Sequence, residues 1–288
     1  MFRGKAAGPL ASCSQALCAW AVLALAVALA CARPAAPQEA PTRSVRAAVL
    51  REMEKHAATL GRSVVAAVFR SLKTGEEAVI EPDRELPAAG LATIPIVVAA
   101  YAAASAGEVD LEAQTSAGRP LRAELERMIA NADLAAADRV LALLGRDRVN
   151  GMCRDLELKQ TVLRGSLAEA PAEGAGNVTS ARDIAALLTI IASGELGAQA
   201  TEDILALLQK HKSGDKIPRE LPQNVPVAHV AGSQSQPMVE SDAAIVFAPT
   251  GPYVLTVIVV GEDPPEAARQ CIAQMSLAVY QAVAGEAN

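Results

Sequence analysis

Apolar runs with strand character lie at both ends of this sequence, and a long stretch between them has only helical spacing. From residue 90 to about residue 195, Ala, Leu and Ile recur at the three- and four-residue intervals of helices. Short Val-rich runs typical of strands occupy residues 63–69, 77–80, 225–230, 241–247 and 253–260. We therefore expect an α/β (α+β) fold in which strands from both ends form one antiparallel sheet beside a separate helical lobe.

Helical patterns over residues 44–60 and 265–283 predict terminal helices that cover one face of this sheet. The chain has 288 residues, of which 51% are hydrophobic, enough for one large domain or two lobes sharing a core. Its net charge of −6 offers no cationic surface for a phosphate backbone, and 2% aromatic residues offer few stacking platforms. We expect no nucleic-acid partner.

The first 32 residues have the pattern of an export signal. Arg3 and Lys5 precede an apolar run over residues 16–30 that ends in small residues. A membrane-spanning helix needs roughly 20 residues, and the Pro-rich residues 33–43 would not continue one. We predict a signal peptide over 1–32, a linker over 33–43 and an exported domain over 44–288, in the periplasm or outside the cell.

The cysteines leave two processing outcomes open. The residues before Cys31 resemble both an ordinary peptidase site and the end of a bacterial lipobox, so Cys31 is either removed or lipidated. Lipidation at Cys31 would be the one membrane attachment we expect. Cys153 and Cys271 fall in helical patterns far apart in the sequence, which indicates two buried free thiols.

Several segments, in matching order, resemble the class A serine β-lactamases among the penicillin-recognising serine hydrolases. They cover nearly all of the exported domain and occupy residues 86–96, 106–111, 128–145, 177–184, 227–232, 242–247 and 252–260. The resemblance implies a five-stranded antiparallel sheet lobe over 44–86 and 222–288, and an all-helical lobe over 87–221. No cofactor is implied.

The first of the family's three motifs, Ser-x-x-Lys, is altered at the matching positions. Gly90 stands where the resemblance implies the nucleophilic serine, and Thr93 stands where it implies the lysine. A serine hydroxyl needs a positioned base to attack a carbonyl, and both groups are missing here. We expect the Thr93 hydroxyl to bond the carbonyl one helical turn back.

The second motif, Ser-Asp-Asn, reads Ala132-Asp133-Leu134. The acid is kept, and the hydroxyl that would relay a proton is lost. We interpret Asp133 as a structural carboxylate that bonds nearby backbone.

The third motif, Lys-Thr-Gly, reads Val230-Ala231-Gly232, so the groups that would hold a substrate carboxylate have become apolar. The glycine indicates a close backbone approach. By analogy with the family, the backbone N–H groups of Gly90 and Ser233 would form an oxyanion hole in a remodelled, less polar cleft.

Two other patterns imitate catalytic residues. Ser213-Gly214-Asp215-Lys216 is a literal Ser-x-x-Lys, but it lies in a turn ahead of a proline, where helical one-turn geometry fails. We interpret it as non-catalytic. Glu169 and Glu173 lie in the loop over residues 168–176, where the resemblance implies a deacylating glutamate, and we interpret both as solvated loop acids.

Of the three histidines, His229 lies on the strand that borders the expected cleft, next to Val230. His56 falls on the first helix and His211 in a charged turn, so we expect neither to join a triad or a metal cluster. The sequence predicts no metal site.

Three functional hypotheses follow. The first is an exported, catalytically inactive relative that binds a cell-wall fragment or an envelope protein through its cleft or surface. The second is an active serine-type hydrolase of β-lactams or peptidoglycan stem peptides, with a nucleophile such as Thr93 or Ser213. The third is a structural envelope protein without a ligand.

Overall fold

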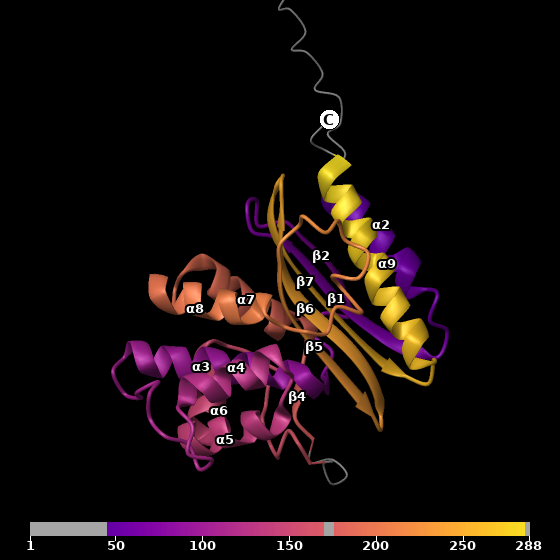
Figure 1. The fold of residues 1–288 in the computed structure, drawn as a ribbon. Coiled ribbons are helices and arrows are strands. Elements are labelled where there is room, and N and C mark those ends of the chain that lie inside the picture. The colour runs from indigo at the N-terminus through magenta and orange to yellow at the C-terminus, as the bar shows by residue number, and fades with distance from the viewer. Residues whose placement is uncertain (1–44, 170–175, 286–288) are drawn as a thin grey trace, which may run out of the picture. The chain divides into compact units, whose positions relative to one another are not determined.

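The computed structural model describes residues 45–169 and 176–285 (Figure 1). The strands of its main sheet are β1 Ser63–Ser71, β2 Glu77–Ile80, β5 Val227–Ser235, β6 Met238–Ala248 and β7 Gly251–Gly261. A second, two-stranded sheet joins β3 Leu86–Pro87 to β4 Val178–Thr179. The helices are α2 Val45–Ala57, η1 Ala89–Ala92, α3 Thr93–Ser105, α4 Leu121–Ala130, α5 Leu134–Leu144, α6 Arg146–Asp155, α7 Ala181–Ser193, α8 Ala198–Gln209 and α9 Pro265–Ala284.

The main sheet has the order β2-β1-β7-β6-β5, and every neighbouring pair is antiparallel. This confirms the predicted fold class, with strands from both ends of the chain in one sheet. β5 continues to Ser235, beyond the expected end at residue 230, because Ser235 still pairs with Met238 of β6. Those last residues are polar, so apolar alternation could not reveal them.

Both faces of the sheet are covered, one by α2 and α9 and the other by α7, with η1 and α8 packed against β5 (Figure 1). Successive residues of β7 serve both layers: Val254 and Ile258 pack in the core with α7, and Leu255 and Val257 pack in the core with α2 and α9. A strand buried on both faces has no polar face, which is why β7 is apolar from Tyr253 to Val260 apart from the buried Thr256.

α3 begins directly after η1 and is buried on nearly all sides. Its sequence is apolar all round, as expected for a helix inside the core. Pro95 lies in the first turn, where its missing N–H costs no hydrogen bond. α3 packs against α5, α6 and α7, so η1 is attached to a rigid part of the fold.

Cys153 in α6 and Cys271 in α9 are both buried and free, as predicted. Burial raises the pKa of each thiol to about 11. Both thiols are therefore protonated near neutral pH and serve as small apolar side chains.

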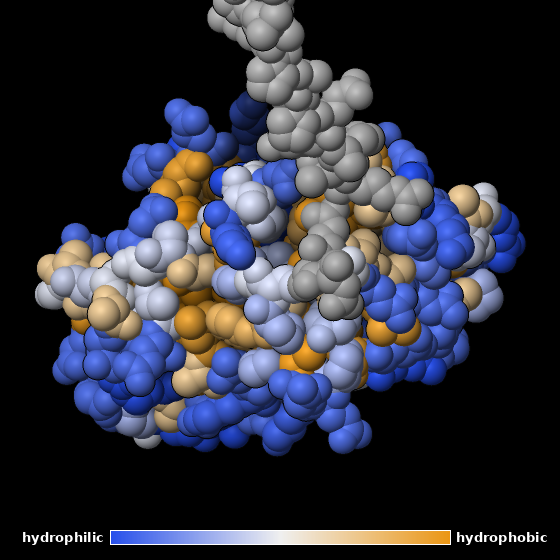
Figure 2. Space-filling model, turned by 90° about the horizontal axis from the view of Figure 1, so that it is seen from above, coloured by the Kyte–Doolittle hydropathy of each residue, from blue (hydrophilic) through white to orange (hydrophobic). Residues whose placement is uncertain are grey.

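Polar and charged residues form the rim of the face seen from above, and apolar residues show between them near its middle (Figure 2). Among the described residues, the exposed large hydrophobic side chains are Leu156 and Val162, each 36% exposed. Such single residues are ordinary on a protein surface.

The expected signal peptide, the linker, Cys31 and Glu173 all lie outside the described residues. No helix in residues 45–169 and 176–285 is long and apolar enough to cross a membrane. The division into lobes at residues 86 and 222 stays a prediction.

Candidate active site

Gly90 lies in η1, where its backbone touches strand β5 directly. A Cβ atom built on Gly90 would stand 2.8 Å from the carbonyl oxygen of Ala231 and 2.8 Å from the Cα of Gly232. A Cβ on Gly232 would stand 2.6 Å from the backbone nitrogen of Gly90. Real Cβ contacts are essentially never this short, so each glycine is required by the other. The contact gives the physical reason for both residues, including the close approach expected at Gly232.

The Thr93 hydroxyl donates a hydrogen bond to the carbonyl oxygen of Gly90 at 2.8 Å. The side chain is 2% exposed, so the hydroxyl has been removed from water and given one backbone partner. This is the local bond predicted for a β-branched hydroxyl in a helix.

Asp133 is the N-cap of α5, the structural role predicted for it. Its Oδ1 accepts from the backbone N–H of Ala136 at 2.9 Å, and its Oδ2 accepts from the Arg127 guanidinium at 2.6 Å. Burial alone would raise the pKa of this carboxyl, but the Ala136 and Arg127 hydrogen bonds outweigh burial and hold the pKa below its ordinary value. Ala132 precedes it with φ +52° and Leu134 begins the helix, so this segment is a helix start built on a charged cap.

On β5, the edge strand of the main sheet, Val230 and Ala231 are buried and Ser233 is exposed. The Ser233 hydroxyl donates to Glu240 Oε2 at 2.6 Å and accepts from the Lys216 ammonium at 3.1 Å. The Ser233 side chain is therefore held by a cation and a carboxylate. The proposed use of its backbone N–H, with that of Gly90, stays a proposal.

Lys216 is buried against β5. Its ammonium donates to the carbonyl oxygen of Gly232 at 3.0 Å and forms an ion pair with Glu240 at 2.9 Å. Ser213 instead donates to Asp215 at 2.8 Å. In the Ser213–Lys216 segment, the serine hydroxyl and the lysine ammonium therefore bind different partners. The residues between them are not helical. Sequence reasoning missed that Lys216 supports the strand beside Gly90.

His211, which the sequence places in a charged turn, contacts a second histidine. Its ring lies 4.8 Å from the ring of His229, edge to face, and His229 Nδ1 lies 3.0 Å from Asp242 Oδ1. The sequence could not reveal this contact because the partners of His211 come from distant segments. The expectation of no metal site stays a prediction, although no group of three potential ligands occurs among the described residues.

The hydrogen bonds of His211 fix its tautomer. Nδ1 faces the carbonyl oxygen of Ile129 at 2.6 Å, and Nε2 accepts from the backbone N–H of Ala231 at 3.1 Å. A carbonyl only accepts and an N–H only donates, so Nδ1 carries the proton and the ring is neutral. The ring connects the end of α4 to the free edge of β5.

Acidification is expected to destabilise the fold through His211. Burial first, and then the neighbouring His229 and Lys216, lower the pKa of His211 below 6.5, against the raising effects of the Ile129 carbonyl and Asp242. A histidine whose folded pKa is depressed contributes stability that is present above its unfolded pKa of 6.5 and is lost as the pH falls through the folded value.

Urea unfolding at a series of pH values checks this. The wild-type free energy of unfolding should decrease as the pH falls below 6.5, and His211→Gln, whose amide can replace both hydrogen bonds without titrating, should lose part of that slope. Burial also lowers the pKa of His56, so His56 contributes to the pH dependence of both proteins. The difference between the two curves therefore isolates the contribution of His211. Parallel curves would contradict the assignment.

A carboxylate from α5 binds the residues just before the loop that was expected to hold a deacylating glutamate. Asp138 of α5 accepts from the Ser166 hydroxyl and from the backbone N–H of Leu167, the latter at 2.7 Å. Glu169 is exposed, in keeping with a solvated acid. The sequence did not predict this role for Asp138, because a carboxylate in an amphipathic helix is usually exposed to solvent.

The main sheet, with η1 against its edge strand and α3 continuing from η1 into the helices, defines a protein of the serine β-lactamase fold. The model of the β-lactamase enzyme family matches residues 47–283. The chain therefore belongs to this family. No match was found among curated proteins.

Solved structures show the same fold. A β-lactamase from Sphaerobacter thermophilus DSM 20745 is 23% identical, with a TM-score of 0.73, and the match covers 83% of this chain and 97% of that one. PBP-A is 24% identical, with a TM-score of 0.72 and coverage of 82% and 96%. An ancestral class A β-lactamase is 18% identical, with a TM-score of 0.75 and coverage of 81% and 99%.

Proposed function

We propose that this chain is a catalytically inactive member of the β-lactamase family. The observation that carries the proposal is the backbone contact between Gly90 and Ala231–Gly232. At the position that resembles the family's nucleophile there is no side chain, and a Cβ would meet backbone atoms at 2.8 Å. Acyl transfer needs a nucleophilic atom and a base within hydrogen-bonding reach of it, and Gly90 and Thr93 supply neither.

The hydroxyls that could replace the missing serine already have partners. Thr93 donates to Gly90 O at 2.8 Å, and Ser213 donates to Asp215 at 2.8 Å. The Ser233 hydroxyl lies 3.1 Å from the Lys216 ammonium, but it donates its proton to Glu240 Oε2 at 2.6 Å. The nearby Lys216 ammonium bonds Gly232, Ser233 and Glu240. An ammonium bound to a carboxylate is a poor base for a serine hydroxyl, and this argues against the alternative of an active hydrolase.

The proposed role is binding. The chain would be exported to the cell envelope, with Cys31 as a potential lipid anchor, and would bind a cell-wall fragment or an envelope protein. In the cleft, the backbone N–H groups of Gly90 and Ser233 would bind a single ligand carbonyl, since such donors do not depend on side-chain identity. A protein with a purely structural role would show no thermal stabilisation by muropeptides, and this measurement separates the two roles.

We expect the purified protein neither to hydrolyse a chromogenic cephalosporin nor to form a covalent adduct with a fluorescent penicillin. Turnover should match that of a protein blank, and intact-mass analysis should show only the unmodified chain. An active class A β-lactamase serves as the positive control. Turnover above the blank, or an adduct mapped to any residue, would overturn the proposal.

A further inference from the structure

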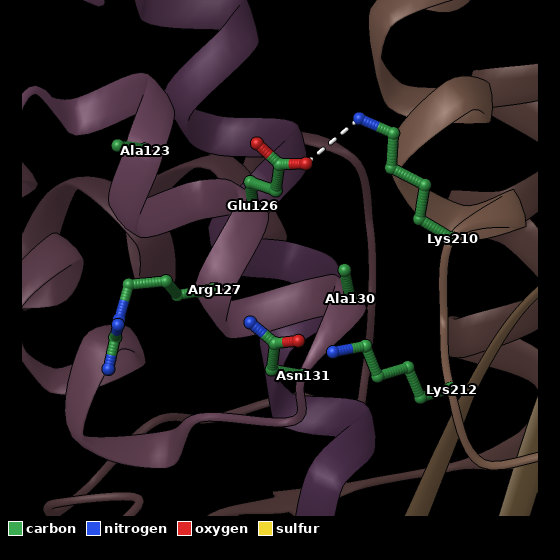
Figure 3. Close-up of a pocket in the computed structure, with 7 residues that line it drawn as sticks. All are labelled: Ala123, Glu126, Arg127, Ala130, Asn131, Lys210 and Lys212. Atoms are coloured by element: carbon green, nitrogen blue, oxygen red, sulfur yellow. Dashed lines mark hydrogen bonds and ion pairs between the residues drawn. The ribbon is translucent and has the colours of Figure 1, made fainter.

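A hollow of about 530 Å³ lies between one side of α4 and the residues that follow α8 (Figure 3). Its volume falls within the range of roughly 300–1,000 Å³ that is usual for small-molecule sites. Two small residues, Ala123 and Ala130, form part of its wall, and the other lining side chains are Glu126, Arg127, Asn131, Lys210 and Lys212. Three of those side chains are cationic and one is anionic, in a chain whose net charge is −6.

Two of the three cationic side chains that line the hollow form ion pairs, and the third does not. Lys210 pairs with Glu126 at 2.9 Å, and Arg127 pairs with Asp133 at 2.6 Å. Lys212 has no ion pair with any residue in 45–169 and 176–285. An ammonium placed in a hollow without a carboxylate favours an anionic ligand there.

Asn131 adds a hydrogen-bond donor next to this charge. Its side chain forms no hydrogen bond within the described part of the chain, and in Figure 3 its side-chain oxygen lies toward the Lys212 ammonium while its nitrogen points away. The backbone N–H of Lys212 donates to Ala130 O at 3.1 Å, which fixes the position from which the lysine extends. Because no hydrogen bond holds the amide, a half-turn about its last side-chain bond would bring its N–H groups to the side of the ammonium, and the two groups could then donate to two oxygens of one anion.

The end of α4 would normally repel an anion, because the last carbonyls of a helix carry partial negative charge. Here those carbonyls are occupied. Ile129 O bonds the ring of His211, Ala130 O bonds the backbone of Lys212, and Arg127 O accepts from Asn131 and Asp133. The hydrogen bonds that attach residues 211–212 to α4 thus reduce the repulsion that an anion would meet.

We propose that this hollow binds a carboxylate or phosphate group, held by the Lys212 ammonium and the Asn131 amide, with Lys210 adding positive potential beside them. The site uses no residue of the Gly90 contact, so it stands or fails independently of catalysis. A carboxylate on a short peptide and a free phosphate both offer negatively charged oxygens that accept hydrogen bonds. The test separates these two sources.

The test is an NMR titration of the isotope-labelled full chain with inorganic phosphate, with N-acetylalanine, and with the neutral N-acetylalanine amide. At least one of the two anions should shift the Asn131 side-chain and Lys212 backbone resonances to saturation, and the amide should not. The anion that does so identifies the source. Lys212→Met should weaken binding about fivefold, the amount expected for one charge-assisted contact at an exposed site.

Matched variants separate the site from general surface charge. Lys159→Met, which removes an exposed lysine elsewhere, should leave binding unchanged. Glu126→Gln should free Lys210 and strengthen binding about two- to threefold, whereas Glu52→Gln, which breaks the exposed Lys55–Glu52 pair, should not. The proposal is overturned if Lys212→Met binds as the wild type does, if neither anion shifts Asn131 and Lys212, or if the neutral amide binds equally.

Discussion

Replacing Lys216 by methionine is expected to lower the free energy of unfolding by about 3 kcal/mol, near the lower end of the range for breaking a buried ion pair. The Lys216 and Glu240 side chains are 2% and 4% exposed, and their charges lie 2.9 Å apart. The variant keeps most of the apolar stem and removes the ammonium. Glu240 keeps the Arg269 guanidinium at 2.8 Å, so the remaining charge is only partly compensated.

Urea unfolding of Lys216→Met, Glu240→Gln and the double variant measures the pair. The double variant should lose less stability than the two single changes together, because the second change removes a charge that the first has left without its partner. Lys55→Met, which breaks an exposed pair with side chains 69% and 37% exposed, should change stability by less than about 1 kcal/mol. Equal, small effects of Lys216→Met and Lys55→Met would show that the buried pair contributes nothing specific.

Local hydrogen bonds of the candidate site could be predicted from sequence, and distant ones could not. Thr93 bonds a carbonyl three positions back, and Asp133 caps a helix through a residue three positions ahead. Residue type and helical spacing determine both bonds. The bond between His211 and Ile129 O joins positions 82 apart, and no local pattern contains it.

One signal could have revealed the buried charges. β6 is apolar for most of its length, yet it includes Glu240 and Asp242. A carboxylate in a strand buried on both faces requires a cation or hydrogen-bond donors close by. Glu240 pairs with Lys216, and Asp242 faces His229 and the backbone N–H of Ile217, so the exceptions to the apolar pattern indicate where distant segments meet.

The fold itself followed from periodicity because the sheet and its helices bury whole faces. What periodicity could not show is the distance between backbones. The sequence indicated a close backbone approach at Gly232, but only the folded chain shows that Gly90 is the residue that makes it. Their role depends on packing between segments more than a hundred residues apart, and a single sequence does not record such packing.

Restoring a serine at position 90 is expected to damage the fold without restoring catalysis. In Gly90→Ser, the new Cβ would stand 2.8 Å from Ala231 O and from Gly232 Cα, both backbone atoms of a paired strand. Either η1 or β5 must shift, at a cost of about 1–3 kcal/mol for overpacking. The hydroxyl would still lack a base, because Thr93 stands in place of the lysine.

Unfolding and activity measured on the same samples test this expectation. Gly90→Ala and Gly90→Ser should both unfold at lower urea concentration than the wild type, and neither should turn over a cephalosporin. Gly61→Ala is the control, because a Cβ there meets nothing within 4 Å and should leave stability within about 1 kcal/mol. If Gly90→Ser unfolds like the wild type, the contact with β5 is loose enough to admit a side chain. Gly90 would then mark only the loss of the nucleophile. The close contact between Gly90 and β5 could not be the physical basis for inactivity. Acylation of Gly90→Ser by penicillin would be stronger evidence against the proposed inactivity. It would require a base, and the contacts of Thr93 and Lys216 do not provide one.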